Sequence, residues 1–536
     1  MKKFGILVVV IGVVLAGMAF FAREKKDVII AKVAQKAVDY LPVPEGQEEE
    51  VAALTAIAKV FLANDGRTRR IFLMLQNNFE LRPTGGFLGQ FAIIEIRNGQ
   101  IVHTEIMDAN VFDKQFKSDH LAPPPLAKYM GIKKWKFRDA NWSPDFPTTV
   151  ADVLHFYSLK EGNDPDFDAV IALNATLLDK ILAITGPITV TTKSRQRGTF
   201  DVTFSADGGA WTLQEAVEKE ILLRDAAIAR AEEEDALKGT HYSPPLDDNG
   251  KKIRKVHPWE RTNRKQIMKD LGAQIVARLM APAQLPQTIP ALIGFGLDGL
   301  ANKDIQIWLK DPALQERARA FAWTGEVDTQ WEGDYLFVVD ANLGSLKSDH
   351  YVTRTIEHTV DFRGRGAEKN DVAAGRMVRY RTPALKEQIM AGTYRAPRAL
   401  ATTRVTYTHS AQKEDWDTKD YHSYTRMIVP AGVQWIVREW FFPPSVDTKT
   451  FANRTVYNYK FDVLIGNPPM PTMLQYILPA SITESDYRFK IQKQSGIGTV
   501  PFTLTVILRD GTRLRYHTDA LMHDMVLRKE DLMPVK

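Results

Sequence analysis

The sequence contains no cysteine among its 536 residues. This absence excludes disulfides, thiolate-bound zinc, iron–sulfur clusters and a cysteine nucleophile. The net charge is also small. The 70 Lys and Arg residues nearly balance the 65 Asp and Glu residues and leave a formal charge of +5. So small an excess does not indicate a nucleic-acid partner. Only one apolar run is long enough to cross a bilayer, so a multi-span membrane protein is excluded.

Several catalytic signatures are missing as well. The histidines show no HExxH spacing, and neither GxSxG nor the phosphate loop GxxxxGK[ST] occurs. We therefore expect no zinc, haem or nucleotide cofactor. Gly294, Gly296 and Gly299 do fit GxGxxG, but Pro290 precedes them closely and a strand pattern follows at 304–309. A dinucleotide site needs a strand before and a helix after the glycines, so we interpret this segment as a turn.

The N-terminus carries the one long apolar run. Residues 4–22 are uncharged and lie between Lys2–Lys3 and the charged segment 23–27. A helix of this length spans about 29 Å, which matches the hydrocarbon layer. We expect an uncleaved anchor over residues 1–26, with the N-terminus cytoplasmic and the rest of the chain extracytoplasmic. A cleaved signal peptide with Gly17-Met18-Ala19 at its cleavage site is the alternative.

The pattern of predicted helices and strands divides the remaining chain into a linker and two domains. Residues 27–65 form a linker that ends in an amphipathic helix. Residues 66–335 alternate strand and helix patterns, which is typical of a mixed α/β domain. They include a buried strand at 71–75, a hairpin around Asn98-Gly99 and a strand at 168–173, followed by a helix that we expect Asn174 to cap. Long helical patterns follow at 212–237 and 261–280, with a strand at 188–192 before them and an exposed insertion at 238–260 between them.

Residues 336–536 predict a β-rich domain. Short strand-like segments separated by turn signals favour a β-sandwich. We place them at 335–340, 351–362, 403–409, 424–429, 461–465, 474–478, 487–492 and 502–508.

The strongest local signal is the segment QNNFELRPTGGF at residues 76–87. It follows a buried strand and precedes the hairpin. Arg82 and the backbone N–H groups of Gly85 and Gly86 are groups that bind an anion at the end of a strand. The alternative is an irregular turn in which Glu80 and Arg82 satisfy each other.

A second cluster, RDANWSPDFP, covers residues 138–147. Arg138, Asp139 and Asp145 in a loop rich in Trp and Pro suit an organised site, although a self-capping turn fits equally. Farther along, Arg261 and Arg264 open a helical pattern. Basic residues there oppose the helix dipole unless they serve an anion or an acidic partner.

These motifs carry a resemblance to a known family. QNNFELRPTGGF, RDANWSPDFP, FDAVIALNATLLDKILAITGPITV at 167–190 and VVDANLGSLKSDHYVTR at 338–354 resemble domain of unknown function 4012. Their order matches that family and the match extends over nearly all of the chain after the anchor. The resemblance implies a bacterial exported or membrane-anchored envelope protein without an assigned activity.

A weaker resemblance is to the LytR-CpsA-Psr phosphotransferases, which transfer a glycan from a polyprenyl-pyrophosphate carrier to a cell-wall hydroxyl. The strand at 71–75, Arg82 in the first loop and Asp108 at the hairpin's end are similar to that family's pattern, as are Arg261 and Arg264 in the late helix. Thr84 and Met107 depart from it, since the family has an aspartate and an arginine there. A metal ligand and a phosphate clamp are therefore in doubt.

The resemblance implies roles for the charged residues. Asp108 or Asp139 would hold Mg²⁺ or accept a proton, with Asp145 as a second metal ligand. Arginines would bind the pyrophosphate, with the glycines of the first loop. These substrate-binding residues are Arg82, Gly85, Gly86, Arg138, Arg261 and Arg264.

Two hypotheses follow. The first is an anchored, phosphotransferase-like protein that binds or transfers a lipid-linked pyrophosphate glycan at the membrane surface. The second is a non-catalytic envelope scaffold that binds glycan or protein through aromatic residues of its β-rich domain, such as Trp416, Tyr421, Tyr424 and Trp435. Core packing is the alternative role of those aromatics.

Overall fold

A computed structural model describes most of the chain. The described residues are 46–194, 198–246, 250–253, 266–279, 281, 285–365, 378–439 and 442–535. The predicted anchor therefore lies outside them, as do Arg261 and Arg264. Within the described ranges, no helix has the length and apolarity that crossing a membrane requires.

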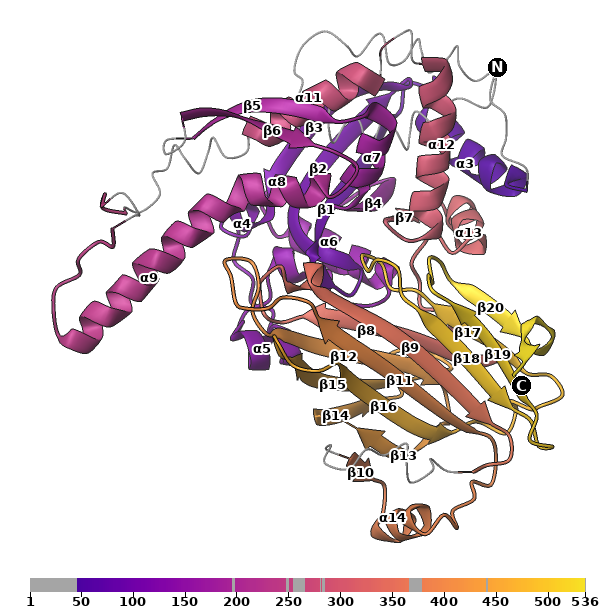
Figure 1. The fold of residues 1–536 in the computed structure, drawn as a ribbon. Helices are drawn as coiled ribbons and strands as arrows, with labels where there is room; N and C mark the ends of the chain where they lie inside the picture. Colours follow the sequence, from indigo (N-terminus) through magenta and orange to yellow (C-terminus); the bar gives the residue numbers. More distant parts are fainter. Residues whose placement is uncertain are drawn as a thin grey trace.

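The first half of the chain is built on a five-stranded mixed sheet (Figure 1). The strands follow the order β3-β2-β1-β4-β7, and only β1 and β4 run parallel. Their bounds are β1 Thr68–Arg82, β2 Gly85–Arg97, β3 Gln100–Asp108, β4 Ala169–Asn174 and β7 Ile305–Leu309. The β2–β3 hairpin turns at Asn98 and Gly99, which both have positive φ (52° and 72°). This confirms the predicted hairpin, because a tight turn of this kind requires positive φ at both positions.

Helices cover both faces of this sheet because successive residues of β1 point to opposite sides. Ile71 and Leu73 face one core, and Phe72 and Met74 face the other. The first core is closed by α3 Glu48–Phe61, α7 Leu177–Thr185, α11 Gln266–Leu279, α12 Leu285–Ala301 and α13 Pro312–Ala320. The second is closed by α4 Ala109–Phe112, the short helix Phe137–Asp139 and α6 Phe146–Ser158. A further short helix, α5 Pro124–Met130, follows α4.

A hairpin and a long helical arm leave this half of the molecule. The hairpin consists of β5 Ile188–Ser194 and β6 Gly198–Phe204. Then α8 Gly209–Gln214 continues through one π-helical turn, Glu215–Lys219, into α9 Glu220–Lys238. Figure 1 shows α9 extending well away from the body of the molecule.

The second half is β-rich, as predicted. An eight-stranded sheet has the order β10-β13-β16-β11-β9-β18-β19-β21 and a six-stranded sheet has the order β14-β15-β12-β8-β17-β20. Inward residues of both sheets share one core, for example Val338 on β8 and Val360 on β9. The bounds in chain order are β8 Asp334–Asn342, β9 Val352–Asp361, β10 Val378–Tyr380, α14 Pro383–Met390, β11 Leu400–His409, β12 Tyr421–Pro430, β13 Gln434–Glu439, β14 Phe442–Asp447, β15 Arg454–Val463, β16 Met470–Ile477, β17 Arg488–Gln492, β18 Phe502–Ile507, β19 Arg513–Thr518, β20 Met525–Arg528 and β21 Met533–Pro534.

Two local predictions are wrong. Gly294, Gly296 and Gly299 lie within the helix α12 and not in a turn, because the apolar face of that segment packs on the sheet. Asn174 does not cap α7: it ends β4, and its side-chain amide donates to Ser495 Oγ (3.1 Å). In both cases a contact distant in sequence overrides the local preference.

Candidate functional site

A cavity of about 360 Å³ lies where the parallel pairing of β1 with β4 ends. Leu75 and Leu173, which pair with each other just before that point, belong to its lining. Ligand sites in mixed α/β sheets characteristically lie at the carboxyl ends of parallel strands. The position of the cavity therefore follows from the topology of the sheet.

The body of the cavity is apolar. Its helical wall consists of Leu177 and Leu178 on α7, Leu213 on α8, Val217 on the π-turn and Met268 on α11. An apolar wall beside polar lining residues suits an amphiphilic ligand, because the ligand's hydrocarbon part leaves water when it contacts the leucines.

Another part of the cavity lining is polar. It includes Gln76, Asn77, Gln90, Asp108, Asn110, Asn174, Gln214, Glu218 and Lys347. The Asn77 amide donates to Gln214 Oε1 (2.7 Å) and so ties β1 to α8. Gln76 Oε1 accepts from the backbone N–H of Gly86 (2.9 Å), whereas its buried Nε2 has no partner among the described residues. This Nε2 is therefore a hydrogen-bond donor available to a ligand in the cavity.

The π-turn places two residues at the cavity. Val217 contributes to the apolar wall and Glu218 to the polar part of the lining. A π-turn is a one-residue insertion into an α-helix, and such turns occur frequently at functional sites. Nearby, the Trp211 ring of α8 stacks on His350 with 3.8 Å between ring centroids, which joins α8 to the β-rich half.

Arg82 does not line the cavity, although the sequence suggested that it binds an anion. Its guanidinium is buried and donates to Glu80 Oε1 (3.0 Å) and to the backbone oxygen of Asn342 (2.8 Å). Lys347 Nζ reaches the other Glu80 oxygen at 3.1 Å. Burial opposes ionisation of Glu80, but Lys347 and Arg82 outweigh it and lower the pKa of this carboxyl. The geometry is that of the alternative considered above, a turn in which Glu80 and Arg82 satisfy each other.

The segment 78–84 forms a junction with the β-rich half. The Leu81 N–H donates to Asp349 Oδ2 (2.8 Å) and the Asn78 amide donates to the Gly496 oxygen (3.0 Å). Gln494 Nε2 donates to the Arg82 oxygen (3.2 Å). We call these contacts, together with the Glu80–Arg82–Lys347 cluster, the junction.

Gly85 and Gly86 serve close packing at this junction. A Cβ on Gly85 would lie 2.3 Å from Asn174 Oδ1, and a Cβ on Gly86 would lie 2.2 Å from the backbone carbon of Asn77. The Gly86 N–H donates to Gln76 and its oxygen accepts from Asn141 Nδ2 (2.7 Å). These backbone groups of Gly86 are therefore engaged within the protein.

The second predicted cluster leads from the junction to the cavity. Asp139 is buried, and burial raises its pKa, while Arg82 and Arg138 act in the opposite direction. Arg138 lies 3.7 Å from Asp139 and hydrogen-bonds Asn110 Oδ1, and Asn110 lines the cavity. Asp108 also lines it and caps α4 by accepting from Asn110 N (2.9 Å). The structure thus brings Arg82, Asp139, Arg138 and Asp108 together, but only Asp108 reaches the cavity.

The other predicted ligands are placed differently. Asp145 caps α6 through Thr148, and its other carboxylate oxygen accepts from Val327 N (3.0 Å), so it does not belong to the cavity lining. Among the described residues, no group of three or more His, Cys, Asp or Glu side chains is arranged to hold a metal. Arg261 and Arg264 lie outside the described residues, whereas Met268, which follows them in the chain, does line the cavity.

The lining residues that the sequence did not suggest come mainly from helices. Leu178, Leu213 and Val217 fit an ordinary amphipathic pattern, which is the same for a helix that packs on a core and for one that walls a cavity. Lys347 belongs to the β-rich half and also lines the cavity. The π-turn within 212–237 was also unexpected.

The aromatic residues proposed for a scaffold are mostly packed. Tyr421 is fully buried and Trp435 packs against the β core. Tyr424 lies 5.7 Å from Trp142 and Trp416 lies 6.2 Å from Trp211, centroid to centroid. Core packing was the alternative role for these side chains, and their positions agree with it.

Comparison with known proteins bears on the first half of the chain. Residues 66–225 match the family described as "Protein of unknown function (DUF4012)", which confirms that resemblance over these residues. The match is shorter than the sequence motifs suggested, because the motif at 338–354 lies beyond it. No curated protein matches the chain.

Several solved structures are similar over about half of the chain. Lin1025 from Listeria innocua is 11% identical, with 49% of this chain and 80% of that chain covered and a TM-score of 0.23. Protein gbs0355 from Streptococcus agalactiae is 12% identical, with 49% and 75% covered and a TM-score of 0.24. TagV from B. subtilis is 15% identical, with 52% and 89% covered and a TM-score of 0.20. TM-scores this low do not establish a shared fold.

Proposed function

We propose that this DUF4012-containing protein is an envelope protein, anchored by its N-terminal segment, that binds a lipid-linked pyrophosphate glycan. The observation that carries the proposal is the cavity: a wall of leucines beside polar residues, at the point where the parallel pairing of β1 with β4 ends. A polyprenyl chain is all hydrocarbon, and each buried CH₂ contributes about 0.8 kcal/mol. The sequence resemblance to the LytR-CpsA-Psr phosphotransferases points to the same class of ligand.

The lipid headgroup would lie beside the polar residues of the lining. Lys347 is a cation in the lining, and Arg138 stands behind Asn110. Lys347 is already shared between Glu80 (3.1 Å) and Glu218 (3.9 Å), so it offers a diphosphate only part of its charge. Arg261 and Arg264 precede α11, which carries Met268 in the cavity wall, and they are our candidates for the remaining positive charge.

The same site contains carboxylates that would hold Mg²⁺ together with the lipid diphosphate. Mg²⁺ is commonly held by one or two carboxylates together with substrate phosphates. Asp108 and Glu218 are the carboxylates of the lining, and Asp108 is the residue that the resemblance assigns to the metal. The ion would neutralise the diphosphate when bound. Burial raises the pKa of Asp139, and this carboxyl lies 3.7 Å from Arg138, which in turn contacts Asn110 of the lining.

A binding measurement with matched variants tests the proposal. The full chain in detergent micelles is titrated with undecaprenyl diphosphate in the presence of Mg²⁺. Leu213→Trp fills the cavity from α8, and we expect at least a ten-fold rise in Kd because the ring takes the space of the lipid. Leu237→Trp is the control, since Leu237 is 84% exposed on the outer part of α9.

Two further variants separate the headgroup from the tail. Arg261→Ala with Arg264→Ala should weaken the diphosphate lipid but leave undecaprenol, which lacks phosphate, unaffected. Asp108→Asn should remove the Mg²⁺ dependence. If Leu213→Trp binds as tightly as the unmodified protein, the lipid does not occupy this cavity and the proposal is wrong.

A further inference from the structure

A polar groove of about 710 Å³ lies on the outer face of the eight-stranded sheet, in the other half of the molecule from the cavity. Its floor is a row of side chains that are directly opposite one another on neighbouring strands. Gln475 on β16 faces Thr402 on β11, which faces Thr359 on β9. Thr359 in turn faces Thr505 on β18, next to Arg515 on β19.

The strand pattern explains why the floor is polar. Val360, Leu504 and Val506 point inward to the core. Thr359 precedes Val360, and Thr505 lies between Leu504 and Val506, so both threonines must point outward. Neighbouring strands lie about 4.8 Å apart. The buried Gln475 amide donates to Thr402 Oγ1 (3.0 Å), and the partly exposed hydroxyls of Thr359 and Thr505 remain as the groups that suit a sugar or polyol chain.

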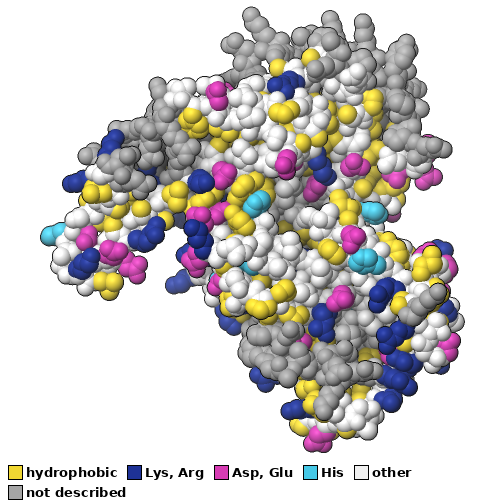
Figure 2. All heavy atoms as spheres, in the orientation of Figure 1, with side chains coloured by type: hydrophobic (Ala, Val, Ile, Leu, Met, Phe, Trp, Pro, Cys, Tyr) yellow, Lys and Arg dark blue, Asp and Glu magenta, His cyan; other side chains and the backbone are white. Residues whose placement is uncertain are grey.

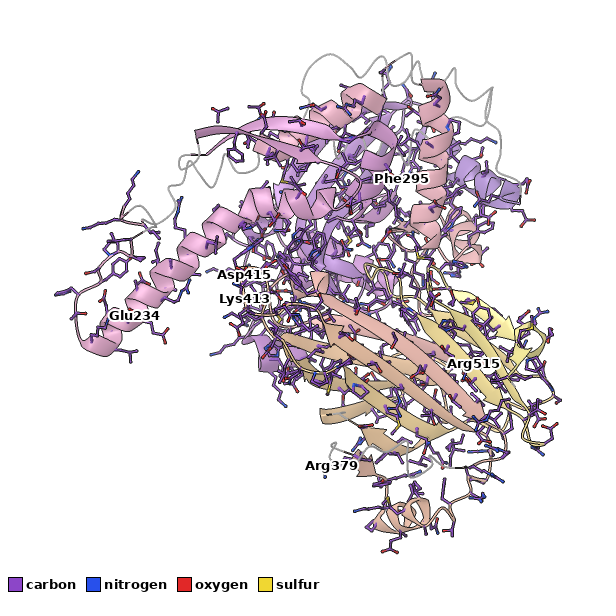
Figure 3. The ribbon with its side chains drawn as sticks, viewed as in Figure 1. Glu234, Phe295, Arg379, Lys413, Asp415 and Arg515 are labelled. Atoms are coloured by element: carbon purple, nitrogen blue, oxygen red, sulfur yellow. The ribbon has the colours of Figure 1, made fainter. Side chains whose placement is uncertain are left out.

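Arginines border the groove on two sides. Arg513 and Arg515 lie along β19, and Arg363 and Arg365 lie on the segment that leaves β9. Figure 3 labels Arg515 on this sheet, and Figure 2 shows Lys and Arg side chains gathered over the same side of the β-rich half. Arg363 is engaged with Asp361 (2.7 Å). Arg513 and Arg515, by contrast, are exposed and have no ion-pair partner among the described residues.

The solvated face of a sheet requires polar residues, but it does not require a hollow with Arg513 and Arg515 exposed along one side. The lining of the groove contains four arginines but only two carboxylates, Glu357 and Asp361, and Asp361 is already paired with Arg363. Side chains two apart on β19 lie about 7 Å apart. A polymer with an anion on each repeat unit can therefore contact both Arg513 and Arg515 while its hydroxyls meet the floor.

We propose that this groove binds a strand of phosphodiester-linked glycan or polyol phosphate. Guanidinium groups bind phosphate oxygens in a bidentate manner, and a tetrahedral phosphate presents oxygens to arginines on more than one side of a groove. A planar carboxylate presents its two oxygens along one edge only. The groove is separate from the cavity, so the proposal does not depend on the lipid-binding function.

The test measures binding of poly(glycerol phosphate), free of lipid, to the full chain in detergent. The variant Arg513→Ser with Arg515→Ser should raise Kd at least ten-fold and reduce the slope of log K against log salt by about 1.4, since two contacts with a flexible chain are lost. The control is Arg379→Ser with Arg381→Ser, which removes the same charge from exposed positions at the β10 edge of the same sheet. Figure 3 shows Arg379 far from Arg515.

A second variant distinguishes the groove from general charge attraction. Thr359→Val with Thr505→Val keeps the charge and the strand-forming shape but removes two floor hydroxyls, and we expect a rise in Kd of about five-fold or more. Neutral dextran, the carboxylate polymer alginate and single-stranded DNA are the comparison ligands. Binding to alginate or DNA as tight as to poly(glycerol phosphate) would overturn the proposal, as would equal affinity in the two arginine variants.

Discussion

Glu80 is the residue on which the junction depends most. Its carboxylate lies between Arg82 and Lys347, and all three side chains are nearly excluded from solvent. A buried carboxylate shared by two cations is costly to remove, because both cations then remain buried without a counter-ion. Its importance for stability explains why this segment stands out in the sequence without requiring that Arg82 touch a ligand.

We predict that Glu80→Gln lowers the free energy of unfolding by about 3–5 kcal/mol. Urea denaturation followed by circular dichroism measures it. Glu316→Gln is the control, because Glu316 pairs with Arg319 on the surface and such pairs contribute at most about 1 kcal/mol. Similar losses in both variants would contradict the role assigned to Glu80.

Asp349 gives the junction a pH dependence. Burial raises the pKa of its carboxyl from 3.8 to about 6, against the hydrogen bonds from Leu81 and Asn342. The folded protein therefore keeps this proton at a pH where the unfolded chain has lost it. The resulting stabilisation is full below about pH 4 and is lost as the pH rises to about 6, and the gap corresponds to about 3 kcal/mol.

We therefore expect Asp349→Asn to flatten the dependence of stability on pH between 4 and 6. Denaturation midpoints at several pH values measure the slope. Asp113 and Asp152, whose pKa values burial also raises to about 6, keep part of the dependence in the variant. An unchanged slope would show that Asp349 ionises normally in the folded protein.

At the scale of elements, the turn between β1 and β2 is fixed by space as much as by hydrogen bonds. Gly85 has φ +137°, a conformation that other residues rarely adopt, and a Cβ there would lie 2.4 Å from Gln76 Oε1 as well as against Asn174. The register of β1 and β2 shifts twice in this region, between Leu75 and Gln76 and again between Asn77 and Leu81. The second shift leaves residues 78–80 without partners on β2, and from this bulge Asn78 and Glu80 reach Gly496 and Lys347 of the β-rich half.

We predict that Gly85→Ala lowers the free energy of unfolding by about 2–3 kcal/mol. Gly294→Ala is the matched control: a Cβ on Gly294, which lies in α12, would have no neighbouring atom within 4 Å, so alanine should be neutral or stabilise by up to about 1 kcal/mol. Thermal denaturation of both variants provides the comparison. Equal stability of the two would show that the turn adapts to the added carbon.

On the scale of the whole molecule, buried charges join the two halves at a second place. Lys303 Nζ lies 2.6 Å from Asp524 Oδ1, with both side chains less than a tenth exposed. Lys493 Nζ donates to the oxygen of Asn302 (3.0 Å), and burial lowers the pKa of this lysine to about 8. Ion pairs enclosed between the halves couple their unfolding, because opening either half exposes the charges of the other.

We expect Asp524→Asn to destabilise both halves together by about 3 kcal/mol. Hydrogen exchange measures this directly, since amides of β1 and β12 should lose protection to the same extent. Asp519→Asn is the control, because the Asp519 side chain is 95% exposed. Loss of protection in β12 alone would show that the halves unfold independently.

The sequence by itself determined the features that depend on near neighbours. The helix at α3, the Asn98-Gly99 turn and the strand patterns on either side of it follow from spacing and from φ preferences within a few residues. The change from an α/β half to a β-rich half can be recognised in the sequence for the same reason, since the alternation of side chains is a local property of each strand.

Only the tertiary structure decided what the charged motifs do. Glu80 and Lys347 are 267 residues apart, so no local pattern shows that they pair, and Arg82 therefore looked available for an anion. Asn174 and the GxGxxG segment differ from expectation for the same reason, because their partners come from other elements. The cavity likewise requires α7, α8, α11 and Lys347 to meet where the pairing of β1 with β4 ends, and the energy of such contacts is set by packing between distant segments.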